Sequence, residues 1–142
     1  MHPENGRVTV RTGNGLYTEV MANGYSMVVD EPVAFGGTGA GPTPYDYLLA
    51  ALGGCAAMTV RMYANRKGWP LDSVRVRMEH SKIHARDCEK CENENGRIDR
   101  IELQLELTGP LDEHQRRRLG KITEKCPVHR SLDSEMLIET RA

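Results

Sequence analysis

The sequence lacks an excess of either charge, a long apolar run, an internal repeat and a low-complexity segment. It has 19 Lys and Arg residues against 20 Asp and Glu residues, scattered along the chain, for a formal net charge of −1. Without a basic stripe, nucleic-acid binding is not expected. No apolar run approaches the ~20 residues that a bilayer requires, and the first residues lack the charged-then-apolar layout of a signal peptide. We therefore expect a cytoplasmic protein with no membrane or nucleic-acid partner.

What is present is a chain of 142 residues without a break in composition. This length favours a single domain over residues 1–142, with only a modest core of its own. Burial of part of its surface in a dimer would add to that core.

Three short segments at 7–12, 16–22 and 25–30 carry alternating, β-branched or aromatic residues, and Asn23-Gly24 is a hairpin signal. They predict a β-meander. The glycine-rich stretch 35–42 matches no phosphate-binding pattern, and we interpret it as a loop that turns into the next helix. Two further strands at 73–84 and 98–108 alternate apolar and charged residues and are expected to pair as a hairpin.

The longest predicted helix runs from Pro44 to Lys67. Thr43 and Asp46 suit a capping box at its start, and Gly68 suits its end. The stretch 48–58 is apolar on every side, which predicts a helix buried at the centre of the fold. Two glycines, Gly53 and Gly54, would weaken such a helix unless a close contact with a partner helix or a substrate compensates.

A second helix is predicted from Asp112 to Cys126, because Pro127 disfavours helical geometry in the residue before it. Leu119, Ile122 and Cys126 then share an inward face. With a final strand at 134–140, the expected fold class is α+β in the order β-β-β-α-β-β-α-β.

Four cysteines in a reducing compartment are more often catalytic or metal-binding than structural. On residue type alone, Cys55 in an apolar helix is most often a small core hydrophobe without reactivity. Cys126 also lies on an inward face, directly before a proline. Two such thiols suggest a peroxidatic and resolving pair, in which a cationic neighbour would have to activate Cys55.

Two motifs carry a resemblance to a known family. The segment Pro44-Tyr-Asp-Tyr-Leu-Leu-Ala-Ala-Leu-Gly-Gly-Cys55-Ala-Ala-Met-Thr and the segment Lys125-Cys126-Pro-Val-His-Arg-Ser-Leu132 resemble the signature cysteine motifs of the OsmC/Ohr family of hydroperoxide reductases. The resemblance covers nearly the whole chain. It implies an OsmC-like, intertwined homodimer with a buried central helix and two active sites at the subunit interface.

The resemblance also implies an activity, a thiol peroxidase that reduces organic hydroperoxides. Cys55 would be oxidised to a sulfenic acid, Cys126 would condense with it to a disulfide, and an external thiol or dithiol would reduce the pair without a cofactor.

In that family a glutamate follows the proline that opens the central helix and orients an activating arginine. This chain has Tyr45 there, so Asp46 and Arg11 are the activating candidates, although Asp46 also has a capping role available. The predicted substrate-pocket residues are Leu48, Leu52, Met58 and Thr59, which packing alone would explain equally well.

A second constellation, His80, His84, Cys88 and Cys91, lies on a strand end and the following loop. His84, Cys88 and Cys91 are suitable zinc ligands, but the usual four-ligand framework is incomplete. The alternatives are an accessory redox C-x-x-C and a solvated loop with reduced thiols. The function that competes with the enzyme is a non-catalytic redox sensor or ligand-binding dimer, which the Tyr45 substitution favours.

Overall fold

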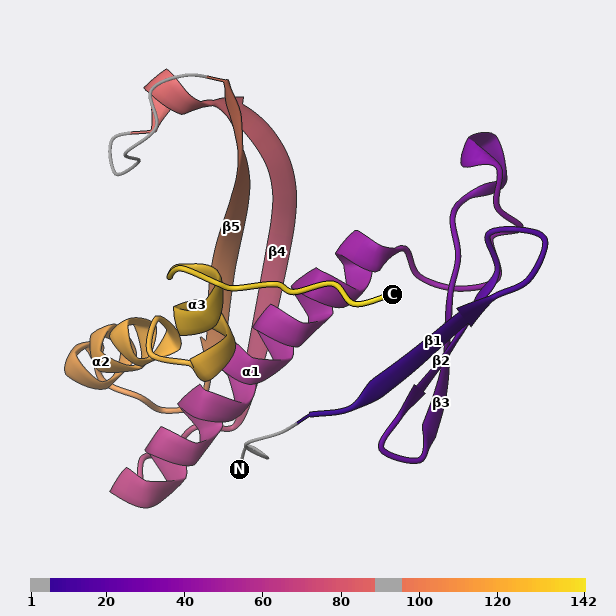
Figure 1. The fold of residues 1–142 in the computed structure, drawn as a ribbon. Helices are drawn as coiled ribbons and strands as arrows, with labels where there is room; N and C mark the ends of the chain where they lie inside the picture. Colours follow the sequence, from indigo (N-terminus) through magenta and orange to yellow (C-terminus); the bar gives the residue numbers. More distant parts are fainter. Residues whose placement is uncertain (1–5, 89–95) are drawn as a thin grey trace. The chain divides into compact units, whose positions relative to one another are not determined.

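The computed structural model describes residues 6–88 and 96–142. It is a mixed α+β structure, as the sequence predicts (Figure 1). The chain divides into two compact units, Met1–Leu48 and Leu49–Ala142. The single domain over residues 1–142 stays a prediction.

The N-terminal unit contains the predicted β-meander. Strands β1 (Val8–Thr12), β2 (Thr18–Ala22) and β3 (Tyr25–Val29) form an antiparallel sheet in the order β1-β2-β3. Asn23 and Gly24 both have positive φ angles, 50° and 84°. These are the left-handed conformations that a two-residue hairpin turn needs, so the Asn-Gly signal is confirmed.

The glycine-rich stretch forms a loop around one buried carboxylate, after a short 3₁₀ turn η1 (Val33–Phe35). Asp30 is 1% exposed and accepts hydrogen bonds from the Thr38 hydroxyl and from the backbone N–H groups of Thr38 and Ala40. The hydroxyl bond is the main cause that lowers the pKa of Asp30. A Cβ on Gly37 would lie 2.0 Å from the Glu31 carbonyl oxygen, so this tight loop requires glycine there.

Helix α1 (Pro44–Lys67) begins and ends where the sequence predicts. The Thr43 N–H donates to Asp46 Oδ2 (2.9 Å) and the Asp46 N–H donates to Thr43 Oγ1 (3.2 Å), which completes the capping box. Gly68 follows with a φ of 69°. By length and composition alone α1 passes as a candidate membrane span. It also supplies buried side chains to both core clusters of the C-terminal unit.

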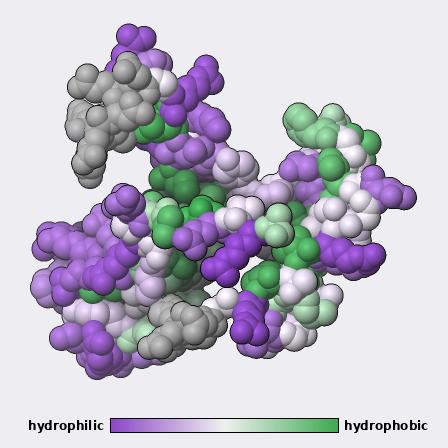
Figure 2. Space-filling view, in the orientation of Figure 1, coloured by the Kyte–Doolittle hydropathy of each residue, from purple (hydrophilic) through white to green (hydrophobic). Residues whose placement is uncertain are grey.

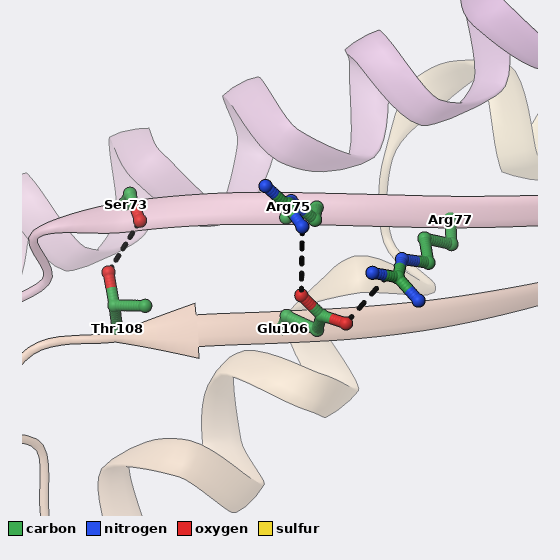
Figure 3. Close-up of polar contacts among 5 residues, drawn as sticks. All are labelled: Ser73, Arg75, Arg77, Glu106 and Thr108. Carbon is green, nitrogen blue, oxygen red and sulfur yellow. Dashed lines mark hydrogen bonds and ion pairs between the residues drawn. The ribbon is translucent and has the colours of Figure 1, made fainter.

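Strands β4 (Ser73–His84) and β5 (Arg97–Thr108) form the predicted antiparallel hairpin, which curves along its length (Figure 1). On its polar face the hydroxyls of Ser73 and Thr108 share a hydrogen bond. The Glu106 carboxylate forms ion pairs with Arg75 (Nη1 to Oε2, 3.9 Å) and Arg77 (Nε to Oε1, 3.6 Å) (Figure 3). The 3₁₀ turn η2 (Ala85–Asp87) follows β4. The alternate, apolar face of the hairpin packs on the core.

Helix α2 (Glu113–Thr123) begins after Asp112, which forms the predicted capping box with Gln115. It packs against α1 through the larger core cluster. That cluster consists of Val60, Ala64, Leu71, Leu111, Leu119 and Ile122.

The C-terminal end of the chain corrects two predictions. Helix α2 ends at Thr123, not at Cys126, and a third helix α3 (Pro127–Leu132) follows, with Cys126 as its extended N-cap residue (ψ 143°). Pro127 does exclude helical geometry at Cys126, but its fixed φ also suits the first position of a new helix. Residues 134–140 form no strand in the described chain. A strand exists only when its backbone joins a ladder, and this segment joins none.

Candidate active site

Cys55 and Cys126 come from different helices and meet in one small apolar cluster. Cys55 lies in the middle of α1 and is 4% exposed, and Cys126 lies between α2 and α3 and is fully buried. Both are free thiols. Leu52 and Ala56 complete the buried cluster, and the side chains packed on it are Met78, Ile101, Leu103 and Val128. The structure therefore brings the two predicted cysteines together.

The thiol of Cys126 has a neighbour on two sides. Its Sγ accepts a hydrogen bond from the His129 backbone N–H at 3.3 Å, and Cys55 lies in the same buried cluster and interacts with it. Burial is the largest cause that raises the pKa of Cys126, and the contact with Cys55 raises it further. The N–H groups of His129 and Val128 oppose this rise. At neutral pH the net effect favours a protonated Cys126.

Gly53 explains how α1 approaches the hairpin next to Cys55. A Cβ at this position would lie 2.4 Å from Cε of Met78, a side chain of the cysteine cluster. A close contact is present at this glycine, but its partner is a side chain of strand β4 and not a partner helix or a substrate. Gly54 has no such neighbour in the described chain.

A cavity of about 210 Å³ adjoins the cysteine cluster. Leu52, Ile101 and Leu103 belong both to its lining and to the shell around the thiols. Its polar residues are Asp99, His129 and Asp133, and Leu132 adds a fourth apolar side chain. Asp99 Oδ1 lies 2.8 Å from His80 Nε2, and this hydrogen bond is the main cause that lowers the pKa of Asp99.

The four predicted pocket residues are not gathered at this cavity. Leu52 lines it, whereas Met58 and Thr59 each line a different cavity on other sides of α1. Leu48 belongs to the N-terminal unit. The difference arises because helix residues one position apart point about 100° apart, so consecutive side chains of one helix do not face one pocket.

The two activating candidates, Arg11 and Asp46, both lie in the N-terminal unit. Arg11 is on β1, opposite Glu19 of β2. Asp46 is engaged in the capping box with Thr43. The capping alternative for Asp46 is thus confirmed, and the activating roles of both residues stay predictions.

The His/Cys constellation is only partly described. His80 contacts Asp99, and His84 Nδ1 accepts a hydrogen bond from the Arg86 N–H at 3.3 Å. Cys88 is disulfide-bonded, and Cys91 lies outside the described residues. No cluster of three or more His, Cys, Asp or Glu side chains occurs within residues 6–88 and 96–142. Zinc and accessory redox chemistry therefore stay predictions.

Sequence reasoning missed Asp99 and Asp133 as cavity residues. Asp99 lies beside His80 only because of the register of the hairpin. Asp99 pairs with Lys82 and Ile101 pairs with His80, so Asp99 and His80 are diagonal neighbours across the two strands. The alternation of apolar and polar residues along β5 does indicate two of the cavity residues, since Ile101 and Leu103 are among its inward side chains. Asp133 follows a helix that the sequence did not predict.

Two free, buried cysteines that meet in the core of an α+β fold define a two-cysteine thiol protein. A family model described as OsmC-like protein matches residues 37–141. The chain therefore belongs to the OsmC-like family, which confirms the resemblance of the two cysteine motifs. No curated protein matches the sequence.

Solved structures share the fold. An OsmC-like protein from Mycoplasma pneumoniae has a TM-score of 0.73 at 18% identity, covering 93% of this chain and 89% of that one. An organic hydroperoxide resistance protein OsmC from Legionella pneumophila has a TM-score of 0.66 at 20% identity, covering 93% and 91%. The organic hydroperoxide resistance protein OhrB of Bacillus subtilis has a TM-score of 0.60 at 17% identity, covering 89% and 88%. At these identities the likeness shows the fold alone.

Proposed function

We propose that this protein is a thiol-dependent peroxidase that reduces organic hydroperoxides through Cys55 and Cys126. The observation that carries the proposal is the meeting of the two free, buried thiols in one cluster, inside an apolar shell that also walls a cavity. Two of the structural relatives bear names that refer to organic hydroperoxide resistance, which supports the same chemistry here.

The proposed cycle has two bond exchanges. The Cys55 thiolate attacks one oxygen of the hydroperoxide, the O–O bond breaks, and the alkoxide takes a proton and leaves as an alcohol. Cys55 is then a sulfenic acid. The Cys126 sulfur attacks it, a disulfide forms and water leaves. An external thiol or dithiol returns two electrons and two protons to the pair.

The unequal surroundings of the two thiols support Cys55 as the attacking residue. Burial and the contact with Cys55 raise the pKa of Cys126, so Cys126 keeps its proton and can donate it in a hydrogen bond to a Cys55 thiolate. Its place beside Cys55 also suits Cys126 to condense with a sulfenic acid there before a second peroxide arrives, and the thiol proton then leaves with the water.

The cavity suits a small hydroperoxide with an alkyl or aryl group. Its volume, about 210 Å³, lies below the usual range for drug-sized ligands. Leu52, Ile101 and Leu103 provide an apolar wall toward the thiols, and His129 provides a polar group beside them.

A redox sensor or ligand-binding protein is the alternative. The 4% exposure of Cys55 favours it, because a hydroperoxide has little access to a side chain buried to this extent. So does Tyr45 at the family's glutamate position. A sensor would react with peroxide once and slowly, whereas an enzyme turns over with thiol reductant.

We further propose that the protein acts as a cytoplasmic homodimer. Met58 of α1 is about half exposed, and Leu137 and Ile138 of the tail are 83% and 80% exposed. Hydrophobic surface also covers parts of the N-terminal unit (Figure 2). So much exposed apolar surface favours association with a second copy. Sedimentation velocity should give twice the chain mass of 15.9 kDa; a monomer at micromolar concentration would contradict the proposal.

The decisive experiment is the reaction of reduced protein with one equivalent of cumene hydroperoxide, followed by intact mass and by cumyl alcohol. We expect one alcohol per chain and the loss of two hydrogens from the protein, because the disulfide replaces two S–H groups. Peptide mapping should join Cys55 to Cys126. A protein whose Cys55 stays reduced while alcohol formation matches buffer alone would contradict the peroxidase.

A further inference from the structure

A second cavity, between α1 and α2, is surrounded by positive charge. Its volume is about 280 Å³. The cationic side chains Arg66, Arg118 and Lys125 line it, together with the Tyr63 ring and hydroxyl. No acidic side chain is among its lining residues. This composition differs from that of the cavity beside the thiols, which contains two aspartates.

The cations converge on Tyr63 in a defined geometry. The Arg118 Nε donates a hydrogen bond to the Tyr63 hydroxyl at 3.0 Å. The guanidinium carbons of Arg66 and Arg118 lie 5.2 and 5.5 Å from the ring centroid, and Lys67 Nζ lies 5.7 Å from it. Contacts of this length with an aromatic face hold cations in place. Tyr63 therefore gathers three cations around one ring.

These cations have no anionic partner within the described chain. None of Arg66, Lys67, Arg118 and Lys125 forms an ion pair with a residue of 6–88 or 96–142. The positive field acts on Tyr63, whose pKa is lowered, first by the hydrogen bond from Arg118 and then by the charges of Arg118, Lys67 and Arg66. Mutual repulsion among such groups is relieved when an anion binds among them.

The rest of the lining is Thr59, whose hydroxyl donates a hydrogen bond to the Cys55 carbonyl oxygen, and two apolar side chains. Met62 and Ile122 lie beside the cations, and Ile122 is a buried member of the core. An inorganic anion alone would leave this surface in contact with water, whereas an alkyl chain would cover it. The volume favours a short chain over a large ligand.

We propose that this cavity binds a small amphiphilic carboxylate, with the carboxylate between Arg66, Arg118 and Lys125 and the alkyl chain against Met62 and Ile122. The site is separate from the thiol pair. It does not depend on the peroxidase proposal, and its test contains no peroxide.

Trp69 provides the readout. It is the only tryptophan of the chain, and its ring contacts that of Tyr63 edge-on at a centroid distance of 5.5 Å. We would titrate the full-length protein with sodium octanoate, with the neutral analogue octanamide and with inorganic phosphate, following Trp69 fluorescence and, in parallel, calorimetry. Octanoate should saturate, and octanamide should bind about 10-fold more weakly, because it loses the charge-assisted hydrogen bonds.

Two arginines on α2 supply a matched pair of variants. Arg118→Gln should weaken octanoate binding about 10-fold. Arg117→Gln removes the same charge from the same helix outside the cavity, and should change binding less than about 2-fold, as expected for a screened charge. Circular dichroism checks that each variant folds, and Arg66→Gln, an exposed residue, takes the place of Arg118→Gln if that variant does not.

Three results would overturn the proposal. The first is no octanoate heat or fluorescence change. The second is octanamide binding as tight as octanoate, or an equal loss in Arg117→Gln, which would leave only non-specific attraction. The third is phosphate binding as tight as octanoate, which would remove the role of the apolar wall.

Discussion

Replacing Cys55 by serine should abolish hydroperoxide reduction, whereas replacing Cys126 by serine should leave one turnover and trap Cys55 as a sulfenic acid. A serine hydroxyl is not ionised at neutral pH and cannot displace alkoxide, so Cys55→Ser loses the nucleophile itself. Cys126→Ser keeps the nucleophile but loses the thiol that closes the disulfide. Intact mass after one equivalent of cumene hydroperoxide should show one added oxygen in Cys126→Ser and no change at this site in Cys55→Ser.

The remaining two cysteines provide the control. The double variant Cys88→Ser, Cys91→Ser should keep the oxidation of Cys55, because the first bond exchange needs only Cys55 and the second needs only the Cys126 beside it. If that double variant also lost turnover with thiol reductant, the accessory-dithiol hypothesis would gain support. If Cys55→Ser still consumed hydroperoxide above the buffer rate, the assignment of Cys55 as the attacking thiol would be wrong.

Leu119→Ala should lower the free energy of unfolding by far more than Lys121→Ala, an alanine substitution on the surface of the same helix. Leu119 is fully buried on α2 and is among the largest fully buried side chains. It packs with Val60 and Ala64 of α1. Truncation removes its contacts and leaves a cavity, at a cost of about 3 kcal/mol. For a chain of this length the melting temperature should fall by roughly 10 °C.

Thermal unfolding followed by circular dichroism measures this effect. Lys121→Ala is the control, because Lys121 is exposed on the same helix and a surface change typically costs within about 0.5 kcal/mol. Equal melting temperatures for the two variants would mean that the contact between α1 and α2 contributes little to the stability of the C-terminal unit.

Local structure was predictable wherever neighbouring residues decide it. The Thr43–Asp46 and Asp112–Gln115 capping boxes, the Asn23-Gly24 turn and the end of α1 at Gly68 all depend on residues within four positions of each other. The β4–β5 hairpin follows from alternation along two adjacent strands. The end of α2 was not predictable in this way, because a proline can follow the end of one helix or occupy the first position of the next. Pro127 occupies the first position of α3.

The site could be predicted only in part. The cysteine motifs identified Cys55 and Cys126, but they lie 71 positions apart, and their meeting in one cluster depends on how α1, α2 and α3 pack. Met58 and Thr59 line other cavities than the one beside the thiols, and their role as substrate-pocket residues stays a prediction. A helix with apolar residues on every side does not indicate which side faces the thiols, and only packing partners such as Met78 and Leu103 decide that.

The sequence by itself determined the α+β class and most element boundaries, because periodicity, capping and turn chemistry are local properties of the chain, and its two motifs named the cysteines that meet in the core. Only the tertiary structure decided the protonation of Cys126, the cavity lined by Asp99, His129 and Asp133, and the group of cations around Tyr63. These features depend on burial and on distances between residues remote in sequence, and neither quantity exists until the chain has folded.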